Sequence, residues 1–164
     1  MVRIILLAAS LIPSYLYAEQ IPQRAVIEEI RGQVSDALVA FAEQEERCME
    51  SKKKLPAIAL QEIGLTESEL KDALEYHYLK NLVICSQSQA DQLIIYSQML
   101  SIASPNQEKQ SSATSELILR DRIKLTKLRQ EYFKISKIQR DLIESVKGMD
   151  RPIDLIATAR MLGI

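Results

Sequence analysis

Two cysteines, Cys48 and Cys85, are the clearest chemical signal in the sequence. The first eighteen residues have the features of a secretory signal peptide, because Arg3 is followed by an apolar run and Ala18 offers a small residue for cleavage. In the oxidising compartments that exported proteins reach, an even pair of cysteines is most simply a disulfide. The sequence therefore predicts a Cys48–Cys85 disulfide in a periplasmic or secreted protein. Free buried thiols or a redox pair are the alternatives, although no Cys-x-x-Cys motif supports redox work.

His77 is the only histidine, and it lies between Tyr76 and Tyr78. A helical metal site would need a second ligand about one turn away, and none is present, so a structural role is favoured. The sequence also lacks the motifs of nucleophile elbows, phosphate-binding loops, zinc proteases and calcium loops. We predict that the protein is not an enzyme and has no catalytic, cofactor-binding or metal-binding residues. A carboxylate pair assembled across two helices, as in a small helical lytic enzyme, is the alternative.

The charges are nearly balanced overall but unevenly distributed. The chain has 21 basic and 22 acidic residues. Residues 116–147 hold nine basic and five acidic residues, whereas residues 19–115 hold nine basic and fifteen acidic residues. On a helix drawn at about 100° per residue, three arginines of the basic segment line one edge of its apolar stripe. These candidate interaction residues are Arg122, Arg129 and Arg140.

Three interpretations of these arginines are open. They can cover apolar edges and face the acidic first helix of the same bundle. They can bind the acidic face of a partner protein, or they can contact an anionic membrane surface peripherally. Nucleic acid is disfavoured, because the chain is nearly neutral and lacks interleaved aromatic and basic residues. We predict a non-enzymatic protein that acts through protein–protein interaction, for example as a component of an envelope assembly. A membrane-surface binder is the further alternative, and the partner and the oligomeric state are left open.

The composition predicts an all-α fold. Of the 164 residues, 47% are hydrophobic and 26% are charged, which excludes a disordered chain. Only four glycines, five prolines and no tryptophan are present, whereas strong helix formers are abundant. We expect residues 19–164 to form one domain, a single helical bundle of three long helices and two short ones with one disulfide.

The spacing of apolar residues and the positions of capping residues predict where the helices lie. Thr66 and Glu69 form a capping-box pattern, so one long helix begins there, and its polar middle at residues 86–92 predicts a solvated or bent waist. Coiled-coil spacing indicates another long helix, and Asp150 is the expected N-cap of the last short one. Residues 101–114 are predicted to be a flexible loop. The predicted helices span residues 23–51, 57–63, 66–100, 115–147 and 152–162.

The predicted disulfide constrains how these helices are arranged. Cys48 lies near the end of the first helix, whereas Cys85 lies about 28 Å along the helix that begins at Thr66. A symmetric hairpin cannot bring these two positions together. Either residues 52–65 run back along the first helix, or the start of the second long helix projects past it. We favour the projection, because residues 86–100 can then pack antiparallel to the first helix.

Overall fold

The computed structural model describes the backbone of residues 12–104 and 108–164, and the side chains of residues 24–104 and 115–164. These residues form six α-helices and no β-strand, which confirms the all-α prediction. Three helices are long and three are short. Their bounds are α1 (Ile12–Glu50), α2 (Ala57–Gln61), α3 (Glu67–Ala103), α4 (Glu108–Tyr132), α5 (Lys137–Ser145) and α6 (Leu155–Leu162).

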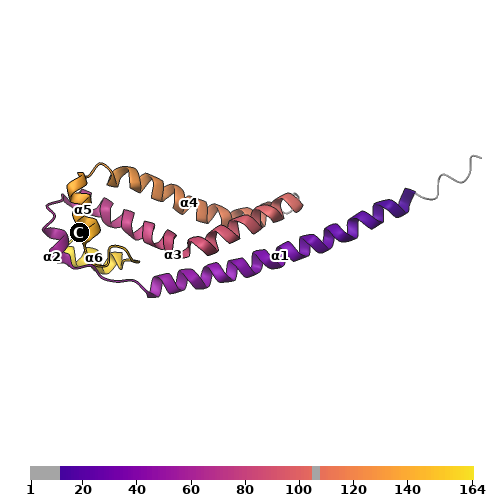
Figure 1. The fold of residues 1–164 in the computed structure, drawn as a ribbon, viewed down its shortest axis with the longest axis horizontal. Coiled ribbons are helices and arrows are strands. Elements are labelled where there is room, and N and C mark those ends of the chain that lie inside the picture. Colours follow the sequence, from indigo (N-terminus) through magenta and orange to yellow (C-terminus); the bar gives the residue numbers. More distant parts are fainter. Residues whose placement is uncertain (1–11, 105–107) are drawn as a thin grey trace, which may run out of the picture.

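The elongated part of the molecule, which we call the stalk, consists of α1, residues 86–103 of α3, and α4 (Figure 1). Its core is small, and the buried residues at its centre come from all three helices. Partly buried Val34 and Phe41 of α1 pack against it. The far end of α1 extends beyond the tip of the α3–α4 hairpin (Figure 1). The buried residues of the stalk core are Ala37, Ala90, Leu93 and Ile118.

The second part, which we call the head, has a larger core at the opposite end. It consists of α2, residues 67–81 of α3, the end of α4, α5 and α6 (Figure 1). The buried residues of the head core are Leu55, Leu60, Leu70, Ala73, Leu74, Tyr76, Tyr132, Ile135, Ile143, Val146, Met149 and Ile153. α3 is therefore shared between the two cores, and its two halves have different neighbours.

The Cys48–Cys85 disulfide is present, with a distance of 6.1 Å between the two Cα atoms. Cys48 is buried two residues before α1 ends at Glu50. The start of α3 consequently projects past the end of α1, and its residues 67–81 pack in the head instead of against α1. This is the arrangement that we favoured from the position of the two cysteines.

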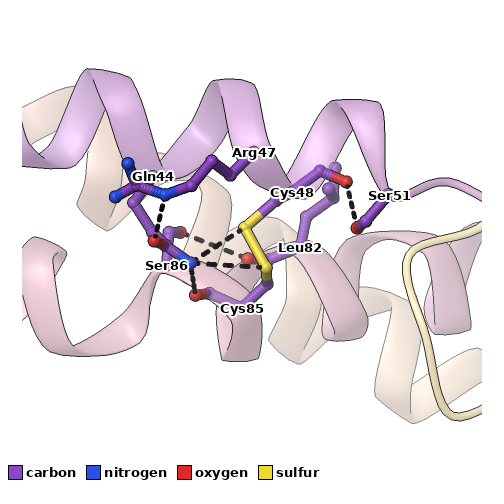
Figure 2. The surroundings of a disulfide bond; sticks show 7 residues. All are labelled: Gln44, Arg47, Cys48, Ser51, Leu82, Cys85 and Ser86. Carbon is purple, nitrogen blue, oxygen red and sulfur yellow. Dashed lines mark hydrogen bonds between the residues drawn. A yellow bond between two sulfur atoms is a disulfide. The ribbon is translucent and has the colours of Figure 1, made fainter.

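Beside the disulfide, α3 bends (Figure 1), as its polar middle predicted. The Ser86 hydroxyl donates to the Leu82 carbonyl at 3.1 Å, and the Gln44 amide of α1 donates to the Cys85 carbonyl at 2.9 Å (Figure 2). Side chains that bond to helix carbonyls in this way lengthen or replace backbone bonds and bend the helix. The bend directs the two halves of α3 into the stalk and the head.

The predicted helix at residues 115–147 is wrong, because α4 ends at Tyr132 and α5 begins at Lys137. The break has two local causes. Ser136 is the N-cap of α5 and accepts from the Gln139 amide at 3.3 Å. The Arg140 guanidinium donates to the carbonyls of Phe133 and Ile135 at 2.9 Å each, so carbonyls freed by the break find a partner.

Other predicted boundaries also need correction. Most of the segment at 101–114 is helical, since residues 101–103 end α3 and residues 108–114 begin α4. Only Ser104 and residues 105–107, which lie outside the described part, separate the two helices. The N-cap of α6 is Asp154, whose carboxylate accepts from the Ala157 amide at 3.0 Å, instead of Asp150. Pairing of Ile153 with Lys53 keeps the preceding residues extended.

The first helix begins at Ile12, earlier than the predicted start at residue 23. Pro13 lies in its first turn, where the missing N–H of proline costs no intrahelical bond. The predicted signal peptide spans residues 1–18. Its residues 1–11 lie outside the described part of the chain, and its residues 12–18 belong to α1. Its cleavage stays a prediction. Ala37 of this helix is buried, whereas its neighbour Leu38 is 43% exposed.

Reduction of the disulfide should destabilise the protein without abolishing its helices. Closing a separation of 37 residues stabilises the fold by about 4 kcal/mol in the chain-entropy description. Urea unfolding followed by circular dichroism, with and without reductant, measures the difference. Thiol titration of the denatured, unreduced protein is the control and should find no free sulfhydryl. Two reactive sulfhydryls per chain in protein from its native compartment would contradict the prediction.

Candidate functional site

A cleft of about 770 Å³ lies on the head, between residues 53–56 and the segment that joins α5 to α6. This volume lies within the range of pockets that hold ligands of drug size, about 300–1,000 Å³. Three stretches of the chain that are distant in sequence form its walls. The lining residues are Lys53, Lys54, Leu55, Pro56, Glu144, Ser145, Val146, Lys147, Gly148, Asp150, Arg151 and Met161.

Backbone pairing fixes one wall of the cleft against the C-terminal segment. The Lys53 N–H donates to the Pro152 carbonyl at 2.9 Å, and the Asp154 N–H donates to the Lys53 carbonyl at 2.8 Å. Two residues after Lys53, the Leu55 N–H donates to the hydroxyl of Thr158 at 3.3 Å. Thr158 is fully buried, so this bond is shielded from water. The segment before α2 is therefore held in place by residues about one hundred positions later.

The opposite wall is held by α3. The buried Asn81 side chain donates to the Met149 carbonyl at 2.8 Å and to the Arg151 carbonyl at 2.7 Å. Between α5 and this pair of bonds the chain turns at Gly148, where φ is +95°. A side chain is strained at such a φ, so glycine suits the turn. One amide thus fixes the backbone on which Lys147 and Arg151 are displayed.

Four exposed cations surround the cleft, and none of them forms an ion pair or hydrogen bond through its side chain within the described residues. They are Lys53, Lys54, Lys147 and Arg151. Two carboxylates, Glu144 and Asp150, also line the cleft, so its formal net charge is +2. Elsewhere on the head, exposed lysines pair with carboxylates within one helix, as Lys137 does with Asp141 at 2.6 Å. Exposed cations without an ion pair within the described residues also occur outside the cleft, as at Lys124 and Lys127, but the cleft brings four of them together around one hollow.

The cleft also has an apolar component. Leu55 and Val146 belong to the head core and are almost completely buried, whereas Met161 of α6 is 47% exposed. Pro56 lies beside them. Cations at the rim and apolar side chains below can together accommodate an anionic group that is attached to an apolar one.

The three predicted arginines do not form one surface. Arg122 lies on the stalk, where its guanidinium contacts the Asp91 carboxylate of α3 at 2.5 Å. Arg129 and Arg140 meet at Phe133, with guanidinium carbons 5.4 Å and 4.5 Å from the centre of its ring. Arg122 therefore pairs with α3, not with the acidic first helix.

Sequence reasoning missed the four cations of the cleft. The run of Lys52, Lys53 and Lys54 is visible in the sequence and could have suggested a basic surface. Lys147 and Arg151 carry no such signal, because only the docking of the C-terminal segment brings them to the same place.

A smaller pocket of about 60 Å³ lies between the stalk helices and contains Glu45, Asp121 and Arg122. Burial raises the pKa of Glu45, and the negative charge of Asp121 raises it further. This is the carboxylate pair across helices that the sequence left open. A volume of 60 Å³ has room for only a few water molecules, so the pocket in this conformation does not hold a sugar or peptide substrate.

His77 lies in the head core and is 1% exposed. Its ring makes edge contacts with Tyr76 and Tyr132, whose rings stack on each other 4.5 Å apart. Among the side chains and backbone that the structure describes, neither ring nitrogen has a hydrogen-bond partner. Burial lowers the pKa of His77 to about 4, and the nearby charge of Lys80 acts in the same direction. The imidazole is therefore neutral at pH 7 and serves as a packing group.

Among the residues with defined positions, no cluster of three or more His, Cys, Asp or Glu side chains could hold a metal ion. Within the same part of the chain, no helix has an apolar stretch sufficient to cross a lipid bilayer. Comparisons with protein-family models, with curated proteins and with solved structures gave no match. The function must therefore be inferred from the site itself.

The predicted arginines should differ in their effect on stability. Arg140→Gln removes two charge-assisted bonds to carbonyls at the α4–α5 break, so the free energy of unfolding should fall by about 1–3 kcal/mol. Arg122→Gln removes a half-exposed ion pair, which contributes only about 0–1 kcal/mol. Urea unfolding of both variants measures the two losses. Equal losses would contradict the capping role of Arg140.

Acid should destabilise the head through His77. Its pKa is about 4 in the folded protein and 6.5 when solvated, so the unfolded chain takes up its proton first as the pH falls. Stability should be constant above pH 6.5 and decrease by roughly 3 kcal/mol as the pH falls to 4. His77→Phe should keep the aromatic packing and remove this decrease. Parallel stability curves for the two proteins between pH 4 and 6.5 would refute this role.

Proposed function

We propose that this protein is an exported, non-enzymatic helical adaptor whose head binds an acidic segment of a partner protein. The observation that supports the proposal is the cleft of about 770 Å³, in which four unpaired cations surround an apolar floor. Other surface cations have partners within the fold: Lys71 pairs with Glu67, and Arg140 donates to two backbone carbonyls. The cations of the cleft are not used in that way, and they remain available to a ligand.

The physical basis of recognition is charge complementarity in a concave site. The cleft has an excess of cations over carboxylates, four against two, and a concave site with a net positive charge attracts oppositely charged groups. Carboxylates of the partner would face Lys54, Lys147 and Arg151. The attraction between these opposite charges increases the association rate and selects acidic sequences. An apolar side chain of the same segment would pack on the Leu55 and Met161 floor and slow dissociation.

The shape of the molecule supports an adaptor role. After cleavage of the predicted signal peptide, α1 would keep residues 19–50, about 48 Å of helix, and the head lies at its C-terminal end (Figure 1). The cleft is thus held far from the start of the helix. The disulfide belongs to the class of bonds that persist in oxidising compartments, which supports export to the periplasm or the exterior. Such a separation between its two ends suits a component of an envelope assembly.

A protein segment fits the cleft better than a membrane does. An extended peptide can enter a concave site, whereas a flat bilayer contacts a face on which apolar side chains protrude beside the cations. In the head, the four cations surround a hollow whose floor residues Leu55 and Val146 are buried. Vesicles of anionic lipid are therefore the appropriate competing probe.

Binding can be tested with a peptide of about twelve residues, long enough to cross the cleft in extended form. The peptide carries glutamates with a leucine at every third position, and fluorescence anisotropy reports its binding. Lys54→Gln combined with Lys147→Gln should weaken binding at least about tenfold, which corresponds to about 1.4 kcal/mol. The matched control, Lys124→Gln with Lys127→Gln on the stalk, removes the same charge and should bind as the unmodified protein does.

Three outcomes decide the proposal. Binding that is lost in the cleft variant and kept in the control supports it. Equal weakening in both variants would mean that only overall charge matters and would overturn the cleft as the site. Binding to anionic vesicles but not to the peptide would favour the membrane interpretation. Capture of native partners from the envelope with the same two variants then identifies the natural ligand.

A further inference from the structure

From Asn81 to its end at Ala103, α3 is almost free of charge. Of residues 81–103, only Asp91 is charged, although the average of 26% for the chain would give about six charged residues. Arg122 neutralises that single charge. A helix face in water normally carries charged residues, so their depletion indicates a face adapted to contact another surface.

Four large apolar residues form a stripe along this half of α3. Ile84 is 57% exposed, Ile95 53%, Met99 41% and Ile102 82%. At 100° per residue these four positions lie within about 60° of one another around the helix. The buried positions Ala90, Leu93 and Ser97 lie on the opposite side and face the core. The stripe is therefore directed away from the helices of its own stalk.

We propose that this stripe is the contact between two copies of the protein, packed antiparallel about a two-fold axis near residue 93. A two-fold interface is self-complementary, so each residue must meet an acceptable residue on the other copy. Positions at equal distances on either side of 93 meet in this arrangement. They pair Ile84 with Ile102, Gln87 with Met99, Ser88 with Gln98, and Asp91 with Ile95.

The charges favour a second copy in this orientation over other occupants. Burying a charged partner helix against an uncharged face would remove the hydration of its charges without compensation. A second copy brings a face with one charge, Asp91, which its own Arg122 compensates. In the antiparallel arrangement the two Asp91 carboxylates lie apart, and each keeps its Arg122 partner. A parallel arrangement would place the two carboxylates opposite each other, where like charges repel.

The size of the stripe predicts a reversible dimer. From Ile84 to Ile102 the helix advances about 27 Å, so the seam is smaller than a standard interface of about 1,200–2,000 Å². Such an interface associates weakly, and the dimer should dissociate on dilution. The four cations of the head cleft lie outside this seam, so dimerisation and peptide binding can be tested separately.

Sedimentation velocity of the mature protein between about 5 and 500 µM tests the dimer, because small interfaces associate in this range. The unmodified protein should shift from monomer to dimer as the concentration rises. Ile95→Glu and Ile102→Glu should remain monomeric throughout. Val39→Glu is the matched control on α1, where Val39 is 55% exposed, and it should dimerise normally. Circular dichroism verifies that each variant is folded.

A monomer at the highest concentration, or dimerisation of both stripe variants, would overturn the proposal. The orientation is tested by mixing the Ser88→Cys and Gln98→Cys variants and adding a short bismaleimide. Only the introduced thiols react, because Cys48 and Cys85 are bonded to each other. The two-fold arrangement predicts links between the two variants. Links between identical variants would instead show a parallel dimer. Lys54→Gln with Lys147→Gln should dimerise like the unmodified protein.

Discussion

The Cys48–Cys85 bond determines how the rest of the chain is arranged, because it fixes the point of α3 at which α1 ends. α1 stops two residues after Cys48, so residues 67–81 of α3 extend beyond its end. An apolar helix face cannot remain in water there, and α2, α5 and α6 cover it. The head is the result of this one offset between two helices.

The same point controls the direction of α3. Beside the disulfide, two backbone carbonyls of α3 accept hydrogen bonds from side chains. The Gln44 amide donates to the Cys85 carbonyl, and the Ser86 hydroxyl donates to the Leu82 carbonyl. The resulting bend separates a stalk face, which is apolar and nearly uncharged, from a head whose cleft is basic. Two proposed contacts, a second copy and an acidic partner segment, thus lie on opposite sides of one constrained turn of helix.

Some of the fold could be predicted because its causes are local. Thr66 and Glu69 form the capping box that the sequence indicated, with the Glu69 amide donating to the Thr66 hydroxyl at 3.3 Å. The break between α4 and α5 has a similar but weaker signal in Ser136 and Gln139, because no glycine or proline marks it. The polar composition of residues 101–114 predicted a loop, but serine and glutamine are tolerated in helices, so α3 continues to Ala103 and α4 begins at Glu108.

The residues of the candidate site could not be predicted from the sequence, because they come together only through contacts between distant segments. Lys53 and Arg151 are brought together by a bridge between segments that are about one hundred residues apart, and no local pattern encodes such a pairing. The three predicted arginines were placed on one edge by assuming a continuous helix. That projection fails after Tyr132, where the chain turns, so Arg140 caps carbonyls while Arg122 pairs with Asp91.

Hydrogen exchange of the oxidised and reduced protein tests most directly whether the disulfide joins two separately stabilised cores. Because the head core contains no residue of α1, reduction should accelerate amide exchange in residues 24–50 and 86–103. Residues 67–81, α5 and α6 should keep their protection. Equal loss of protection in the head and the stalk, or no change in α1, would contradict the account.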